Sequence, residues 1–148
     1  MTVAAVVERD GRFLCVEEHT RDGLRINQPA GHLDPGESLP EAAVRETLEE
    51  TAHPFTPTGL LGVYVWRAAN GVTYTRFAFI GEVGEPEAGR ALDTGIVRAL
   101  WLTADELRAC RAAHRSPLVM RCVDDYLSGR RFPLDLICTH ASVTSADQ

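Results

Sequence analysis

The 148-residue chain contains no lysine, and all 15 of its basic residues are arginine. Without lysine the protein cannot form a Schiff base with a substrate, and it cannot contain the lysine-bearing phosphate loop of Walker type. Acidic residues outnumber basic ones, 21 to 15, which gives a formal net charge of −6. This balance argues against a broad surface that follows nucleic-acid phosphates, so we expect no nucleic-acid partner.

Paired cysteines and long apolar runs are also missing. The four cysteines show neither a CxxC pair nor the spacing of a zinc site: Cys15, Cys110, Cys122 and Cys138. We expect them to be reduced, since a free cysteine generally behaves as a small apolar side chain. No apolar stretch is long enough to cross a bilayer, and residues 2–8 lack the basic leader and cleavage site of a signal peptide. These absences predict a cytoplasmic protein without a membrane partner.

Runs of apolar and β-branched residues predict strands at 2–8, 12–18, 60–67, 72–83 and 96–102. Two pairs of these runs are joined by Asp10-Gly11 and Asn70-Gly71, dipeptides that are typical of tight hairpin turns. The polar segments 19–25 and 85–95 are predicted to be loops.

Helices are predicted at 39–51, 103–113 and 116–127. The first follows a capping box, in which Ser38 precedes Glu41 by three residues. Its face with Val44, Leu48 and Thr51 is expected to dock on a sheet.

Strands interspersed with helices indicate an α/β fold in which a mixed β-sheet lies between helical layers. The length suits a single domain, which we place at 1–138. The polar segment 139–148 lacks periodicity and is predicted to be a flexible tail.

The first predicted helix gathers several acidic residues. Glu46, Glu49 and Glu50 are one, three or four residues apart and project together, and Glu37 lies just before the helix. Like charges this close raise one another's pKa unless a cation lies among them. Hard carboxylate oxygens suit Mg²⁺ or Mn²⁺, so the pattern predicts a divalent metal site.

A solvated helix face is the alternative explanation, since Arg45 can pair with Glu41 and Glu49 one turn away on either side. The wider pattern argues against it. Six residues stand in the spacing Gx5Ex7RExxEE: Gly31, Glu37, Arg45, Glu46, Glu49 and Glu50. A chance match in a chain of this length has a probability on the order of 10⁻⁵.

The segment 31–53, GHLDPGESLPEAAVRETLEETAH, resembles the Nudix box of the Nudix hydrolases. It departs from the usual pattern at Thr47, Ala52 and His53, and none of these changes removes a ligand. Ala52 matters most, because a helix that ends in a left-handed residue usually ends in glycine. INQPAGHLDPGE, YTRFAF and RSPLVMRCVDDYLSGRRFPLDLI resemble the NudJ subgroup of Nudix phosphatases.

The resemblance implies a Nudix fold and a Mg²⁺-dependent hydrolase, with Mn²⁺ as an alternative ion. It assigns the metal to the Gly31 carbonyl and to Glu46, Glu49 and Glu50. Arg45 and Glu37 join these glutamates as catalytic residues, because they typically pair to fix the loop onto the helix. Glu46 is the first candidate for orienting the attacking water. Three acids of the following loop are alternatives for that role or for a further ligand: Asp93, Glu85 and Glu87.

The NudJ-like segments imply that phosphate is released from a small organic pyrophosphate. A thiamine-type pyrimidine pyrophosphate, thiamine pyrophosphate, and a nucleoside di- or triphosphate remain open as substrates. Predicted substrate-binding residues are Arg25, Gln28, Arg76 and Trp66, since guanidinium groups match phosphate oxygens and an indole can stack on a ring. Four histidines have no partners at ligand spacing and are expected to be incidental: His19, His32, His114 and His140.

Two alternatives remain open. A nucleotide-sugar or ADP-ribose pyrophosphatase is one, although residues 67–69 lack the proline that ADP-ribose enzymes of this family usually carry there. A Nudix-fold module that binds nucleotides without turnover is the other, although such modules usually lose glutamates of the box. The sequence is consistent with a monomer or a homodimer.

Overall fold

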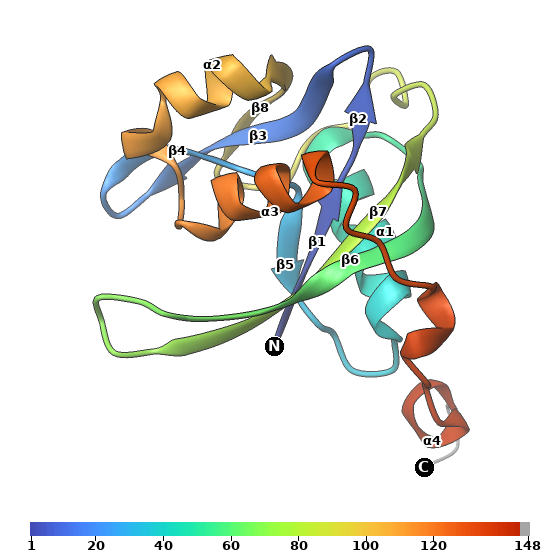
Figure 1. Ribbon diagram of the computed structural model, residues 1–148. Coiled ribbons are helices and arrows are strands. Elements are labelled where there is room, and N and C mark those ends of the chain that lie inside the picture. Colours follow the sequence, from blue (N-terminus) through green and yellow to red (C-terminus); the bar gives the residue numbers. More distant parts are fainter. Residues whose placement is uncertain (146–148) are drawn as a thin grey trace.

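Two four-stranded β-sheets form the centre of the fold (Figure 1). The computed structural model describes residues 1–145, and residues 146–148 lie outside its described part. The first sheet has the order β5-β1-β7-β6, with the bounds Ala30–His32, Thr2–Val6, Thr73–Val83 and Phe55–Arg67. Its strands β1 and β7 are parallel and its other pairs are antiparallel, so it is the mixed sheet that the sequence predicted.

The second sheet is antiparallel. The sequence predicted a single mixed sheet and did not indicate a second one. Its central strand β3 (Arg12–Thr20) pairs with the three others: β2 (Glu8–Arg9), β4 (Gly23–Asn27) and β8 (Ile96–Thr103). The prediction of a loop at 19–25 is wrong, because β3 extends to Thr20 and β4 begins at Gly23. The β3–β4 hairpin is formed by polar residues, which carry no alternating apolar signal.

Helices cover both faces of the mixed sheet, which confirms the predicted α/β class. Helix α1 (Leu39–Thr51) packs on one face, and α3 (Leu118–Leu127) packs on the other beside α2 (Ala104–Ala109). Two apolar clusters result, one between the sheet and each helical layer. The predicted helix 103–113 ends early, since α2 stops at Ala109 and a 3₁₀ turn, η1 (Arg111–Ala113), follows.

Local signals in the sequence correctly mark the first helix and the hairpins. The Ser38 hydroxyl accepts the Glu41 N–H, and the Glu41 carboxylate accepts the Ser38 N–H, so the capping box is complete. Positive φ angles at Asp10 and Gly11 match the left-handed backbone that a tight turn of this kind needs.

The docking face of α1 differs from the prediction. Val44 and Leu48 are only half-buried, and the buried uncharged residues are small or short: Ala42, Ala43, Thr47 and Thr51. Both threonine hydroxyls donate to helix carbonyls one turn earlier, at 2.7 and 2.6 Å. Small side chains and internally bonded hydroxyls let the helix lie close to the sheet, which positions its charged face near β5.

Helix α1 ends at Ala52, which has φ 63° and ψ 4° in the left-handed region. This is the position where the box pattern has glycine. We expect Ala52→Gly to raise the free energy of unfolding by about 0.5 kcal/mol. Relief of left-handed strain contributes about 1–2 kcal/mol, and the lost buried methyl offsets about 0.8 kcal/mol of it.

Urea denaturation monitored by circular dichroism measures this change. Ala109→Gly is a matched control at an exposed site in α2, where it should destabilise the protein by up to about 1 kcal/mol. Equal losses in the two variants would contradict the strained conformation at Ala52.

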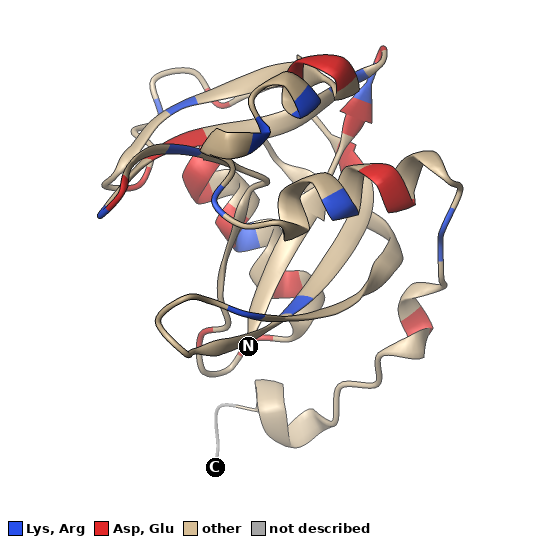
Figure 2. Cartoon of the chain, turned by 60° about the vertical axis from the view of Figure 1, so that its left-hand side comes forward, with Lys and Arg blue, Asp and Glu red and all other residues tan. Residues whose placement is uncertain are grey.

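The C-terminal segment returns along β6 before it leaves the body of the protein. Phe132 pairs with Leu60 through two backbone hydrogen bonds of 2.8 Å, and the 3₁₀ turn η2 (Leu134–Leu136) also packs on β6. A short exposed helix, α4 (Ala141–Thr144), lies within the segment predicted as a tail, whose last residues are not described. No helix of the described chain is both long and apolar enough to span a membrane. Arginine and acidic residues are interspersed along the chain (Figure 2).

Candidate active site

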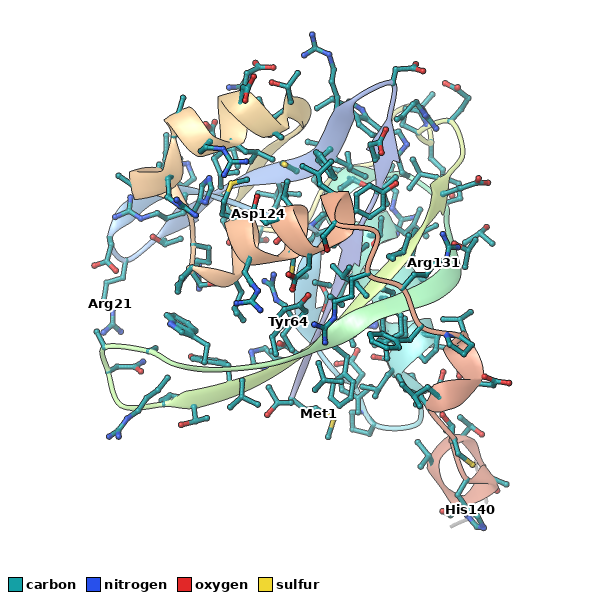
Figure 3. All side chains as sticks on the ribbon, viewed as in Figure 1. Met1, Arg21, Tyr64, Asp124, Arg131 and His140 are labelled. Carbon is teal, nitrogen blue, oxygen red and sulfur yellow. The ribbon has the colours of Figure 1, made fainter. Side chains whose placement is uncertain are left out.

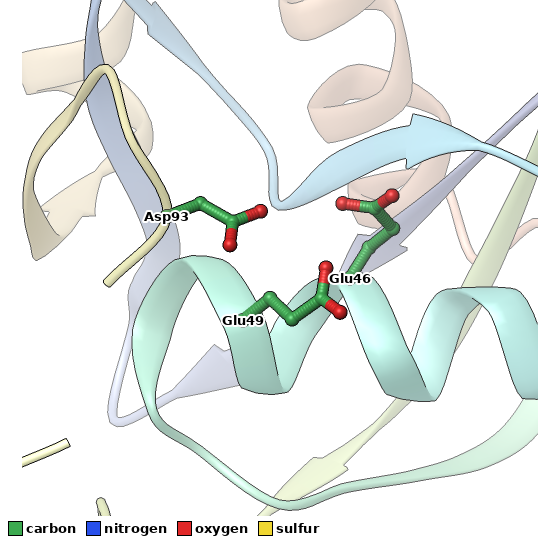
Figure 4. Close-up of side chains that lie close together, drawn as sticks. All are labelled: Glu46, Glu49 and Asp93. Atoms are coloured by element: carbon green, nitrogen blue, oxygen red, sulfur yellow. The ribbon is translucent and has the colours of Figure 1, made fainter. Parts of the chain in front are cut away.

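Three carboxylates from two distant parts of the chain converge beside α1 (Figure 4). Glu46 and Glu49 project from the helix, and Asp93 reaches them from the loop before β8. One oxygen of each lies within 4.8 Å of the others. The backbone holds the loop in place, because the Asp93 N–H donates to the Glu49 carbonyl at 3.0 Å. A cluster of hard oxygen ligands at this spacing fits a divalent cation.

The structure distinguishes among the acids of the 85–95 loop. Of the three candidates, Asp93 lies in the carboxylate cluster of the described chain, whereas Glu85 and Glu87 do not. Glu87 pairs instead with Arg90 at 3.0 Å, and its N–H donates to the Ala52 carbonyl. Glu87 therefore ties the loop to the end of α1.

Glu50 takes a different position from its two neighbours. Only 8% of its surface is exposed, and its carboxylate accepts the Ala30 N–H at 2.9 Å. Burial and the charges of Glu46 and Glu18, partly offset by this hydrogen bond, raise the pKa of Glu50 to about 8. Glu50 thus links α1 directly to β5, and its predicted role as a metal ligand stays a prediction.

Arg45 contacts acidic residues on both sides of the helix start. Its guanidinium lies 2.7 Å from Glu37, 2.9 Å from Glu46, 3.2 Å from Glu49 and 3.3 Å from Asp34. The bidentate contact with Arg45 lowers the pKa of Glu37, and the same contact raises the pKa of Arg45. The expected pairing of Arg45 with Glu37 is therefore present, and it joins the glycine-rich loop to the helix.

Gly31 lies against the carboxylate of Glu46. A Cβ atom added at Gly31 would overlap that carboxylate, so the absence of a side chain at this position lets the Glu46 carboxylate lie against β5. Only 12% of the Glu46 side chain is exposed, and burial raises its pKa. A cation would stabilise the charged form of this partly buried carboxylate, which lies beside two others. The role of the Gly31 carbonyl as a ligand stays a prediction.

Two of the predicted substrate-binding residues contact each other inside the protein. Arg76 on β7 is 6% exposed and donates to Gln28 at 2.9 Å and to Asn27 at 3.0 Å. Gln28 in turn donates to the Val119 carbonyl of α3. Arg76 therefore joins β7, the β4–β5 connection and α3. The structure places Arg25 elsewhere, on β4, where it donates to the Leu24 carbonyl.

Trp66 lies at a cleft between the β6–β7 hairpin and the segment 111–120. The cleft has a volume of about 510 Å³, and its other walls include Arg111, His114, Arg115 and Met120. Tyr64 lies two residues before Trp66, between β6 and α3 (Figure 3), and its hydroxyl donates to Asp125 at 2.8 Å rather than facing a ligand.

Two residues at these sites could not be found from the sequence. His114, expected to be incidental, is buried at the cleft. Glu18 pairs with Arg115 at 3.4 Å and contributes to the raised pKa of Glu50. Neither position belongs to a motif. Only the fold brings Glu18 near both Arg115 at the cleft and Glu50 on α1.

Comparison with known families identifies this arrangement. The model of the NUDIX domain matches residues 1–122. The chain belongs to the Nudix family. The solved structure of a NUDIX hydrolase from Nitrosomonas europaea is 54% identical, with a TM-score of 0.92 over 94% of this chain and 95% of that one. A MutT NUDIX hydrolase from Burkholderia pseudomallei is 22% identical with a TM-score of 0.70 over 84% of this chain and 95% of that one, which supports the fold alone.

Relatives named Phosphatase NudJ cover nearly the whole chain. The protein of Escherichia coli strain K12 is 38% identical over 137 residues, which are 93% of this chain and 89% of the relative. That of Shigella sonnei is 38% identical over 138 residues, with the same coverage. These findings confirm the predicted Nudix fold and the resemblance to NudJ phosphatases, and they make this Nudix protein a hydrolase that acts on pyrophosphate-containing compounds.

Proposed function

We propose that this Nudix protein is a Mg²⁺-dependent phosphatase that cleaves a phosphoanhydride bond of a small organic pyrophosphate and releases phosphate. The convergence of Glu46, Glu49 and Asp93 carries this proposal. Relatives that cover 93% of the chain are named phosphatases, which supports the release of phosphate as the product. The proposed substrates are a thiamine-type pyrimidine pyrophosphate, thiamine pyrophosphate, or a nucleoside di- or triphosphate.

The three clustered carboxylates would hold Mg²⁺ or Mn²⁺, with the Gly31 carbonyl beside them. A bound divalent cation supplies charge neutralisation at phosphate oxygens and lowers the pKa of an attacking water. Glu46 is the proposed group for orienting that water, since its carboxylate is partly buried and lies against Gly31 within the cluster. Arg45 and Glu37 keep the loop and helix in fixed register.

Arg76 and Gln28 hold the connection that leads into Gly31, and we assign them a positioning role for phosphate binding. The Arg76 guanidinium has only neutral hydrogen-bond partners in the described chain: Asn27, Gln28 and the Cys122 thiol. A buried cation without a carboxylate creates a positive potential that favours anions nearby.

Removal of divalent metal tests the proposed function. We expect an EDTA-treated enzyme to lose phosphate release from nucleoside diphosphates and thiamine pyrophosphate, and to regain it when Mg²⁺ or Mn²⁺ is added. Chromatography of the products identifies the bond that is broken. Full activity in EDTA would contradict the proposal, and a nucleoside monophosphate with a sugar phosphate would favour the pyrophosphatase alternative.

A further inference from the structure

The cleft beside Trp66 lies outside the carboxylate cluster and has its own chemistry. Trp66 stacks on Tyr74, with ring centroids 5.8 Å apart and planes inclined by 23°. This contact limits rotation of the indole, so it forms a preset wall of the cleft. Pro117 and Met120 add apolar surface. A cleft of about 510 Å³ with a fixed aromatic wall suits a flat ring.

The charged groups that line the cleft are all cationic. Arg111 has no carboxylate within 4.0 Å in residues 1–145, and Arg115 pairs with Glu18 at 3.4 Å with half of its side chain exposed. Guanidinium groups only donate hydrogen bonds. A ring that binds here must therefore carry acceptors, and a positively charged ring would be repelled.

His114 adds a neutral group to the wall. Its Nε2 lies 2.8 Å from the Leu107 carbonyl, which can only accept, so Nε2 carries the proton and Nδ1 is an acceptor. This Nδ1 is buried and has no hydrogen-bond partner in the described chain. Burial lowers the pKa of His114, which keeps the imidazole uncharged. A ligand N–H that reached Nδ1 would satisfy an acceptor that the protein leaves unpaired.

The cleft and the carboxylate cluster lie at the two ends of one short segment. His114 and Arg115 are joined to Ile26 of β4, where the Arg115 N–H donates to the Ile26 carbonyl at 2.8 Å. Five residues further along the chain, Gly31 lies against Glu46. Even a fully extended chain of that length spans at most about 18 Å. The two backbone positions that contact the cleft and the carboxylate cluster are therefore no further apart than this.

We propose that this cleft binds a neutral heteroaromatic ring of the substrate, stacked on Trp66 with its acceptor groups on Arg111, and that it rejects a cationic ring. The proposal rests on the proposed function and narrows it. Among the candidate substrates, it favours compounds with an uncharged, carbonyl-bearing base over thiamine pyrophosphate, whose thiazolium is a permanent cation. The expected preference comes from the arginines, and the expected stacking comes from Trp66.

Binding of unphosphorylated probes tests this inference without metal or turnover. We expect uridine to shift the indole N–H resonance of Trp66 in nuclear magnetic resonance spectra and to leave that of Trp101 unchanged. Isothermal titration should show thiamine binding at least fivefold more weakly than uridine. Equal or tighter binding of thiamine, or no shift of Trp66 at millimolar uridine, would overturn the proposal.

Matched variants separate stacking from charge. Trp66→Ala should weaken uridine binding at least about fivefold, since base stacking on an aromatic ring contributes at least that factor. Val65→Ala, at the adjacent exposed position on β6, should change the affinity for uridine by less than about twofold. Arg111→Glu should reverse the preference, so that thiamine binds more tightly than uridine. Arg108→Glu makes the same charge change outside the cleft and should leave the preference for uridine unchanged.

The outcomes distinguish this inference from the proposed function. Uridine binding at Trp66 without any metal-dependent phosphate release would contradict the function and leave the cleft assignment intact. Metal-dependent release with unchanged uridine affinity in Trp66→Ala would overturn the cleft assignment alone.

Discussion

Replacement of Glu49 by glutamine is expected to lower kcat/KM at least about a hundredfold. Mutation of a residue that only hydrogen-bonds to a metal ligand already lowers metal affinity or activity about ten- to a hundredfold, and Glu49 is a proposed ligand itself. Glu49 lies within 4.8 Å of Glu46 and Asp93, and glutamine keeps its size while removing its charge. The fold should persist, since 32% of the side chain is exposed and its contact with Arg45 contributes less than about 1 kcal/mol.

Glu41→Gln provides the matched control on the same helix. Glu41 is exposed and caps the helix start, and glutamine can still accept the Ser38 N–H. Steady-state kinetics should therefore be unchanged in this variant. Titration with Mn²⁺ gives a second measurement, in which Glu49→Gln should bind the ion at least tenfold more weakly. Normal Mn²⁺ affinity together with normal turnover would show that the metal lies elsewhere.

Gly31→Ala is expected to abolish most activity while the protein stays folded. A Cβ at this position would overlap the carboxylate of Glu46, which is the free end of a flexible side chain. The carboxylate can move away without displacing the backbone, so the loss falls on the site rather than on the fold. A displacement of about 1 Å in a catalytic group reduces turnover about a hundredfold.

Gly84→Ala controls for the added methyl group. Its Cβ would lie 3.7 Å from Pro54, an ordinary contact, and the residue is exposed. Kinetics and melting temperature together decide the outcome. A Gly31→Ala variant that loses activity only in proportion to a lowered melting temperature would contradict the displacement of Glu46.

Signals confined to a few neighbouring residues allowed much of the fold to be predicted. The capping box at Ser38 and the turns at Asp10-Gly11 and Asn70-Gly71 depend on backbone angles and hydrogen bonds within four residues. The spacing of Glu46 and Glu49 on one helix face is equally local. Such features need no knowledge of the partner elements, which is why the pattern alone sufficed.

Features that depend on distant packing could not be predicted. The acidic loop contains three candidate carboxylates, and only the folded path of the loop, which joins the Asp93 N–H to the Glu49 carbonyl, brings Asp93 into the cluster. Helix α1 docks through Ala42 and Ala43, although larger apolar residues were expected, because close approach to the sheet favours small side chains. His114 has no sequence partner and becomes notable only where α2 meets the cleft.

The β6–β7 hairpin extends beyond the rest of the mixed sheet, and its tip points away from α1 (Figure 1). The proposed metal-binding carboxylates lie on α1 and on the loop before β8, whereas Trp66, the proposed contact for the substrate ring, lies on this hairpin. If both assignments hold, we expect changes in the hairpin to alter which molecule binds and to leave the hydrolytic step unchanged. This separation makes the hairpin and the segment 111–120 the natural region for retargeting the enzyme by directed evolution.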